Sequence, residues 1–257
     1  MEITVKNLSF SYGAHRVLDG VSFTAQSGEL LAVLGPNGVG KSTLFYCLLG
    51  LSRPGAGELL LDGNPIGALP PSALARQIAY VPQSHAPTFN YSVFDMVLMG
   101  TTARVGGLSA PGGEELRLAD EALERVGITH LRGRGYLRVS GGERQLTLIA
   151  RALAQQAKIL IMDEPTASLD YGNQLRVLSC VKALTREGYT VVQSTHNPDH
   201  AFLFADRALA LKDGRVAALG TPRDAMTESL IESLYGVRVR LRENEDGQLR
   251  CDPILDS

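Results

Sequence analysis

Short hydrophobic runs separated by turn-forming residues fill the first hundred positions. Residues 3–5 alternate apolar and polar side chains, and residues 29–34 form an almost continuous apolar run before a glycine-rich loop. Alternation with a period of two favours strands, and Gly or Pro at the ends of a run favours turns. This part of the sequence predicts strands over residues 3–5, 17–23, 29–34, 57–63 and 78–83.

From residue 84 the apolar positions follow a helical period instead. Ser92 is placed to cap a helix that runs to Gly100, and residues 114–126 carry Leu116, Ala119, Leu123 and Val126 on one face. A third helix is predicted over residues 140–155, and residues 101–113, rich in glycine, are predicted to form a loop. We therefore expect residues 84–155 to form a helical subdomain inserted into an α/β core.

Strands and helices alternate again from residue 158. The pattern predicts strands over residues 158–163, 190–194, 207–212 and 215–219, and helices over residues 173–186 and 199–204. In the tail, residues 237–242 alternate apolar residues with arginines, and residues 248–251 can pair with them across Asp246-Gly247. The arginines either contact an acidic partner or form a solvated strand face. The second interpretation is favoured, because charged side chains are mostly exposed.

Composition narrows the class of protein. The chain of 257 residues is 44% hydrophobic and 20% charged, and its net charge of −2 indicates no general nucleic-acid-binding surface. No apolar run approaches the roughly 18 residues that a membrane-spanning helix needs, and the first residues lack a signal-peptide profile. Cys47 and Cys180 lie among apolar helical residues, so we expect buried thiols in a reducing cytoplasm.

A glycine-rich loop between a predicted strand and a predicted helix carries the strongest chemical signal. The phosphate-binding pattern G-x-x-x-x-G-K-[ST] is met by Gly35, Pro36, Asn37, Gly38, Val39, Gly40, Lys41, Ser42 and Thr43. Glycines let backbone N–H groups surround an anion, and the helix N-terminus adds partial positive charge. Lys41 is expected to reach the β- and γ-phosphates and Ser42 to ligate Mg²⁺. The sequence therefore predicts a nucleoside triphosphate site.

Two further patterns are consistent with phosphate chemistry. Residues 159–162 are apolar and run into Asp163 and Glu164, as a buried strand ending at a catalytic edge would. Asp163 is placed for Mg²⁺ and Glu164 for a general base. Ser140 with Glu143 forms a capping box, which alone indicates only a well-capped helix. The intervening Gly141 and Gly142 are costly in a first helical turn, so we interpret them as backbone that closes onto an anion.

In these motifs and their order over residues 2–236, the chain resembles the nucleotide-binding subunit of an ATP-binding cassette (ABC) transporter. Residues 35–43 match the Walker A motif, residues 159–164 match Walker B, and residues 140–143 match the family signature, with Val139 where leucine is usual. The remaining matches are Tyr12 for the adenine-stacking A-loop, Gln83 for the Q-loop, which contacts Mg²⁺ or water, Ser168 and Asp170 for the D-loop, and His196 for the switch histidine.

The resemblance implies a RecA-like P-loop NTPase core with an N-terminal antiparallel β subdomain, the helical subdomain, and residues 237–257 as a C-terminal extension. It implies an ATPase that forms a head-to-tail dimer with a second copy, so that Ser140, Gly141 and Gly142 act on the partner's ATP. Transmembrane permease subunits, and through them an extracytoplasmic solute-binding protein, are the other implied partners. Such a subunit lies on the cytoplasmic face of the inner (plasma) membrane.

Residues 81–100 and 140–170 are most similar to the subgroup that imports iron–siderophore, haem, cobalamin and molybdate-type solutes. A cassette for another solute stays an alternative. A soluble ABC ATPase acting on DNA or ribosomes is less favoured, because such proteins usually carry a coiled-coil insertion or two cassettes. A regulatory cassette without hydrolysis is disfavoured because Lys41, Asp163, Glu164 and His196 are all present.

Two local patterns leave narrower expectations. His196 and His200 have a zinc-like spacing, but Asn197-Pro198 breaks the helix between them, so zinc is disfavoured. Residues 84–104 are more apolar than a solvent-facing segment should be. Most of their apolar side chains belong in the core, and a few are expected to receive a cytoplasmic helix of the permease.

Overall fold

The computed structural model describes residues 1–83, 89–103 and 110–254, and the chain divides into two compact units. The first unit contains Met1–Leu69 and Lys182–Ser257, and the second contains Pro70–Val181. The predicted boundaries at residues 2–236 and 84–155 stay predictions.

An antiparallel sheet opens the first unit. Its strands lie in the order β2 (His15–Ala25), β1 (Ile3–Tyr12), β4 (Ala56–Leu61) and β5 (Asn64–Pro65). The first predicted strand was too short, because β1 continues through register shifts after Val5, where Asn7 has a φ of 50°. Such bulges interrupt the alternation of apolar and polar residues from which a strand is recognised. The predicted antiparallel β subdomain is thus present.

A second group of strands in the first unit is mainly parallel. Strand β3 (Leu30–Leu34) lies between β8 (Thr190–Thr195) and β9 (Arg207–Lys212), parallel to both, and β10 (Arg215–Gly220) pairs antiparallel with β9. Every residue of β3 and β8 is buried. Parallel strands covered on both faces take such unbroken buried runs. Their predicted positions are confirmed to within about one residue at each end, the usual uncertainty of strand boundaries.

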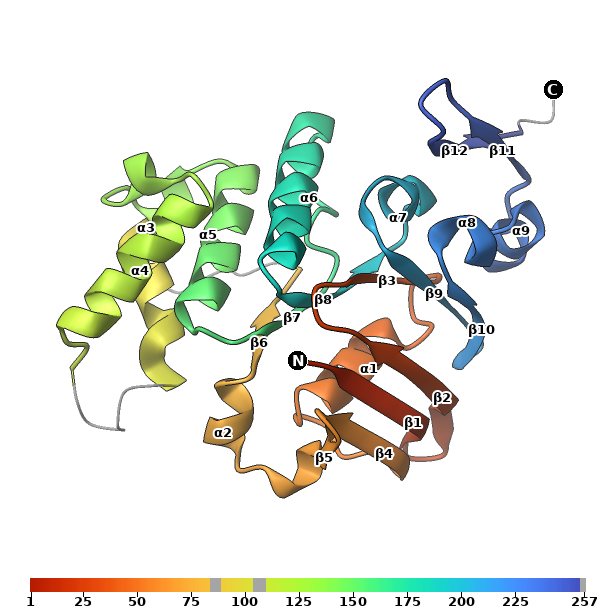
Figure 1. Cartoon of the computed structure of the whole chain (residues 1–257), viewed down its shortest axis with the longest axis horizontal. Coiled ribbons are helices and arrows are strands. Elements are labelled where there is room, and N and C mark those ends of the chain that lie inside the picture. Colours follow the sequence, from red (N-terminus) through yellow and green to blue (C-terminus); the bar gives the residue numbers. More distant parts are fainter. Residues whose placement is uncertain (84–88, 104–109, 255–257) are drawn as a thin grey trace. The chain divides into compact units, whose positions relative to one another are not determined.

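Helices and a hairpin complete the first unit (Figure 1). These elements are α1 (Lys41–Leu48), the 3-10 turn Ile66–Ala68, α7 (Pro198–Phe204), α8 (Pro222–Ala225), α9 (Glu228–Tyr235), β11 (Val239–Glu243) and β12 (Leu249–Pro253). The hairpin β11–β12 turns over Asp246-Gly247 as predicted. Arg240 and Arg242 are exposed on β11 while Val239 is buried, which supports the interpretation of a solvated strand face.

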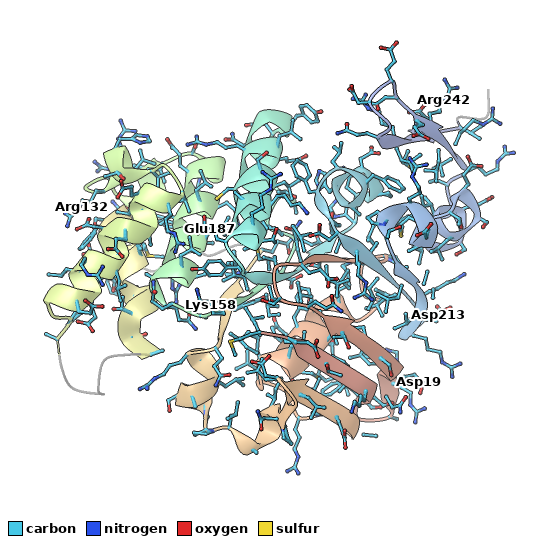
Figure 2. The ribbon with its side chains drawn as sticks, viewed as in Figure 1. Asp19, Arg132, Lys158, Glu187, Asp213 and Arg242 are labelled. Atoms are coloured by element: carbon cyan, nitrogen blue, oxygen red, sulfur yellow. The ribbon has the colours of Figure 1, made fainter. Side chains whose placement is uncertain are left out.

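The second unit holds a parallel strand pair and most of the helices. Its elements are α2 (Pro71–Ala75), β6 (Ile78–Val81), α3 (Val93–Leu98), α4 (Gly113–Arg125), α5 (Gly141–Ala154), β7 (Ile159–Met162), α6 (Tyr171–Arg186), whose end belongs to the first unit, and 3-10 turns at Met99–Ala103, Thr129–Leu131 and Tyr136–Arg138. Helices α3, α4 and α5 pack together (Figure 1). Arg132 lies over the Phe94 ring and pairs with Asp120, which links the loop after α4 to α3 and α4 (Figure 2).

A few expectations need comment. The 3-10 turn Met99–Ala103 includes the end of the predicted helix and the start of the loop predicted over residues 101–113, and residues 104–109 of that loop lie outside the described residues. Cys47 is buried, whereas Cys180 is only half-buried, because it lies at the edge of the covered face of α6. Within the described residues, no helix is long and apolar enough to cross a membrane.

Candidate active site

The glycine-rich loop connects the buried end of β3 to the start of α1. Gly35, Gly38 and Gly40 all have positive φ, at 153°, 81° and 111°. A Cβ at Gly35 would lie 2.6 Å from the Leu211 carbonyl oxygen, and one at Gly40 would lie 2.9 Å from a Leu18 methyl. Glycine is therefore required at both positions by backbone conformation and by close packing.

The N-terminus of α1 suits an anion. Its N-cap is Gly40, and among the described residues no side chain caps the helix and no acid lies in its first turn. The first N–H groups of a helix need acceptors from outside it, and their partial positive charge favours a negative one. This arrangement fits the predicted phosphate site.

Lys41 is folded back over the loop. Its Nζ donates to the Gly35 oxygen at 2.8 Å and to the Pro36 oxygen at 3.2 Å, and the side chain is 6% exposed. The ammonium is thus held where the loop curls, and Ser42 beside it is exposed. A cation and a hydroxyl at the start of one helix suit a phosphate chain and a bound divalent ion.

His196 leaves the same edge of the sheet as the glycine-rich loop. Leu34 at the end of β3 pairs with Thr195 at the end of β8, and the two strands are parallel. The carboxyl ends of neighbouring parallel strands meet at one edge of a sheet. The segments that start at Gly35 and at His196 therefore leave this edge side by side. His196 is exposed, whereas His200 is buried in α7, where desolvation and then the nearby His196 lower its pKa. Only His196 is positioned to meet a ligand.

Tyr12 ends β1 in the same unit. The side chain is 55% exposed, and its ring meets Phe10 edge-on with the centroids 4.8 Å apart. A large exposed aromatic ring, oriented by a second ring, is suited to stacking on a flat ligand. Tyr12 is therefore not a core residue.

The acidic pair occupies a strand end in the second unit. Val81 of β6 pairs with Met162 of β7, and the Asp163 N–H donates to the Val81 oxygen at 2.9 Å. Gln83 and Asp163 therefore leave one edge of this parallel pair. Glu164 follows with a φ of 41°, a strained backbone conformation of a kind that gathers at functional sites.

The signature segment begins α5 with the predicted capping box. Ser140 Oγ accepts from the Glu143 N–H at 3.3 Å, and Glu143 accepts from the Ser140 N–H at 2.7 Å. The pKa of Glu143 lies below its usual value, because its carboxylate is hydrogen-bonded first to the Ser140 backbone N–H and then to the Ser140 side chain.

Close packing explains why residue 142 is a glycine, and the sequence did not predict this contact. A Cβ at this position would overlap the side-chain oxygen of Asn173. Asn173 in turn donates to both carboxylate oxygens of Asp170, at 2.9 and 2.7 Å, and these bonds lower the pKa of Asp170. Asn173 thus joins the predicted signature segment to the predicted D-loop, where Ser168 is exposed. No local pattern announces this contact, because it joins two separate helices.

The site residues thus form two sets, one in each unit. Tyr12, the glycine-rich loop and His196 lie in the first, while Gln83, Ser140, Asp163, Glu164 and Asp170 lie in the second.

Comparisons with known proteins agree with this chemistry. Residues 18–167 match the family model described as ABC transporter. An uncharacterized ABC transporter ATP-binding protein of Haemophilus influenzae is 41% identical over 91% of this chain and 89% of its own length. A hemin import ATP-binding protein of Nocardia farcinica is 40% identical over 91% of this chain and 80% of its own length.

Two other matches extend over nearly all of this chain. A cobalamin import ATP-binding protein of Halobacterium salinarum is 39% identical, and this chain spans 64% of that protein, which is less than two thirds. A solved structure described as an inward-facing, metal-chelate type ABC transporter is 33% identical, with a TM-score of 0.87. That match covers 98% of this chain and 97% of the other.

Proposed function

This chain belongs to the ABC transporter family, and we propose that it is the ATP-hydrolysing subunit of a metal-chelate importer. The observation that carries the proposal is the shared edge of β3 and β8. The loop after β3 leads to the start of α1, which no described side chain caps, and to Lys41. His196 follows the neighbouring end of β8. This arrangement offers N–H groups, an ammonium and an imidazole to one triphosphate.

ATP is proposed to bind with its phosphates in the loop of residues 35–43 and its adenine on Tyr12. The side chains proposed for Mg²⁺ are Ser42, Gln83 and Asp163, whose hydroxyl, amide and carboxylate oxygens are the donors that this ion prefers. When bound, the ion neutralises charge on the phosphates. Asp163 is 9% exposed, and its backbone N–H is bonded to the Val81 oxygen. Its carboxylate is therefore suited to an ion bound beside the phosphates.

Glu164 is proposed as the base that takes a proton from the attacking water. His196 is proposed to contact the γ-phosphate and to support the charge that develops there. Lys41 is proposed to hold the β- and γ-phosphates, and Glu164 has a strained backbone of the kind that gathers at functional sites.

A second copy of this chain is proposed to complete each site. The start of α5, with Ser140 as its N-cap, presents N–H groups that suit the phosphates of a partner's ATP. Two ATP molecules would then hold a head-to-tail pair together, and hydrolysis would release it. Permease subunits at the cytoplasmic face of the membrane would receive that motion, and an extracytoplasmic binding protein would deliver the solute.

The proposed class of solute rests on the names of similar proteins. Proteins named for hemin and cobalamin import, and a structure named for metal chelates, are 33–40% identical to this chain. We therefore favour an iron–siderophore, haem or cobalamin importer over one for molybdate-type oxyanions or for another class of solute.

Reconstitution tests this assignment. The chain would be placed in lipid vesicles with its permease, and phosphate release measured with solute-binding proteins loaded with haem, a corrinoid or an iron–siderophore. We expect one loaded form to stimulate hydrolysis. Stimulation by a sugar- or amino-acid-loaded protein, and by no metal chelate, would overturn the solute class and leave the ATPase assignment intact.

A further inference from the structure

The C-terminal hairpin β11–β12 cannot be stable as an isolated pair of strands. Two-stranded hairpins are marginal in water and need packing against other elements. Val239 is the buried residue of β11, while Arg242 is exposed and lies on the hairpin, away from the strands of the unit (Figure 2). Attachment to the rest of the unit must therefore come from particular contacts.

Two backbone N–H groups of the hairpin are held by carboxylates. The Leu241 N–H of β11 donates to Glu228 Oε1 at 2.7 Å, which attaches the hairpin to α9. The Cys251 N–H of β12 donates to Asp199 Oδ1 at 2.8 Å, and β12 packs on α7. Hydrogen bonds to a charged acceptor are about twice as strong as neutral ones. The hairpin is thus attached to α7 by a strong bond.

Helix α7 begins directly after His196. The Asn197 side chain accepts from the Asp199 N–H at 2.9 Å, and the Asn197 N–H donates to Thr195 Oγ1 at 3.1 Å. Asp199 therefore belongs to the same hydrogen-bonded turn that flanks His196 on both sides. A change in the position of Asp199 would therefore also move His196, because only one turn of the chain separates the two residues.

The other end of α7 is fixed to the sheet. The Asp206 N–H donates to the Leu30 oxygen at 3.0 Å, and Asp206 Oδ2 accepts from the Leu30 N–H at 2.9 Å. With its C-terminal end held by β3, α7 is fixed at its start by β8 and by the hydrogen bonds of its first turn. That start is where the Asp199–Cys251 bond acts.

We propose that Asp199 is a positioning residue, through which the C-terminal hairpin holds His196 in place for ATP hydrolysis. This inference rests on the role proposed for His196. It gives the C-terminal tail a function in turnover, with no contact between the tail and ATP.

A second role of Asp199 must be separated from this one. As an acid in the first turn of α7, it also interacts favourably with the helix dipole. Asparagine removes the charge but keeps an oxygen that accepts from the Cys251 N–H. Alanine removes both. The pair Asp199→Asn and Asp199→Ala therefore distinguishes the hydrogen bond from the charge.

The experiment measures kcat and KM for ATP with the purified full chain. Loss of one such bond corresponds to a fall of about threefold to tenfold in kcat for Asp199→Ala, with KM unchanged. Asp199→Asn should stay within about twofold of the unaltered chain, since its acceptor remains. Glu232→Ala, which removes an exposed acid from α9, is the matched control and should change neither constant.

A second measurement does not depend on turnover. Hydrogen exchange of the Cys251 and His196 amides should speed up in Asp199→Ala and return toward normal in Asp199→Asn. Unchanged kcat in Asp199→Ala, while His196→Ala is impaired, would overturn this inference alone. An Asn variant as impaired as the Ala variant, or a fully active His196→Ala, would also overturn it. If the unaltered chain did not hydrolyse ATP, both the proposed function and this inference would be wrong.

Discussion

Glu164 is an acidic residue that lies just after the end of β7, and its backbone is left-handed, with a φ of 41°. Glu164→Gln keeps the size of the side chain and removes the carboxylate proposed as the base. We expect ATP turnover to fall by about 10²- to 10⁴-fold while ATP affinity is retained. Phosphate release and equilibrium binding of a fluorescent ATP analogue measure the two quantities separately.

The control for that variant is Glu124→Gln, which removes an exposed acid on α4 and should leave turnover unchanged. If Glu164→Gln hydrolysed ATP as fast as this control, Glu164 would not be the base.

Cys47 lies on α1 and is 1% exposed, and burial raises its pKa from 9.0 to about 11. The thiolate is the reactive form, so we expect iodoacetamide at about pH 8 to leave Cys47 unmodified in the folded chain and to modify it after denaturation. Peptide mass spectrometry gives the extent of modification. Rapid labelling of Cys47 in the folded chain would contradict its burial.

The same shift in pKa has a consequence for stability. The folded chain keeps the Cys47 proton between pH 9.0 and about 11, where the unfolded chain loses it. The folded state then binds more protons, so raising the pH through this interval lowers the free energy of unfolding. Cys47→Ala should remove that part of the pH dependence.

Individual residues differ in how far the sequence predicts them. Lys41 and Ser42 are identified by a local pattern whose chemistry requires those residue types, and the positive φ values of the nearby glycines agree with it. The contact of Gly142 with Asn173 has no such pattern, because it depends on how α5 and α6 pack. The same holds for the bond from Cys251 to Asp199.

At the scale of elements, Gly100 sets how closely the turn after α3 approaches α5. A Cβ there would overlap the Arg151 carbonyl oxygen and lie 3.4 Å from the Ala154 Cβ. Backbone cannot give way as a flexible side chain can, so Gly100→Ala should lower the free energy of unfolding by about 1–3 kcal/mol. Urea denaturation followed by circular dichroism measures this change.

Gly133→Ala is the matched control in the same unit, since a Cβ at Gly133 meets nothing within 4 Å. Its effect should stay within about 0.5 kcal/mol. Equal effects of the two substitutions would contradict the close approach at Gly100.

Long periodic helices were predicted well, whereas several short helices were missed. Helices α4 and α5 were found from their apolar faces, whereas α2, α8 and α9 were missed. Their start signals are present, with Pro71 at the first turn of α2 and Thr227 capping α9. A helix of four to eight residues shows few apolar positions, so a start signal such as Ser92 before α3 can decide whether it is recognised.

At the scale of the whole molecule, the proposed dimer makes a direct prediction. The Glu164→Gln chain should sediment as a dimer with ATP and as a monomer with ADP. Adding Ser140→Arg should abolish the dimer, because a long cationic side chain would occupy the place proposed for the partner's phosphates. Analytical ultracentrifugation distinguishes the two species.

Arginine at residue 140 also removes a helix cap, so the comparison needs a variant that weakens the cap alone. Glu143→Gln in the Glu164→Gln chain does this while keeping Ser140 in place. It should still dimerise with ATP. Loss of the dimer in both variants would mean that helix stability, and not the start of α5, controls association.

The missing cap of α1 has a thermodynamic consequence. Helix starts that lack a protein acceptor are completed by whatever anion occupies them, so nucleotide becomes part of the fold of this segment. A ligand at a hundred times its dissociation constant adds about 2.7 kcal/mol to the free energy of unfolding. ADP would give this stabilisation as readily as ATP, whereas a nucleoside without phosphates would give little. The melting temperature of the chain would then follow nucleotide concentration, and depletion of nucleotide would lower the free energy of unfolding while most sites were still occupied.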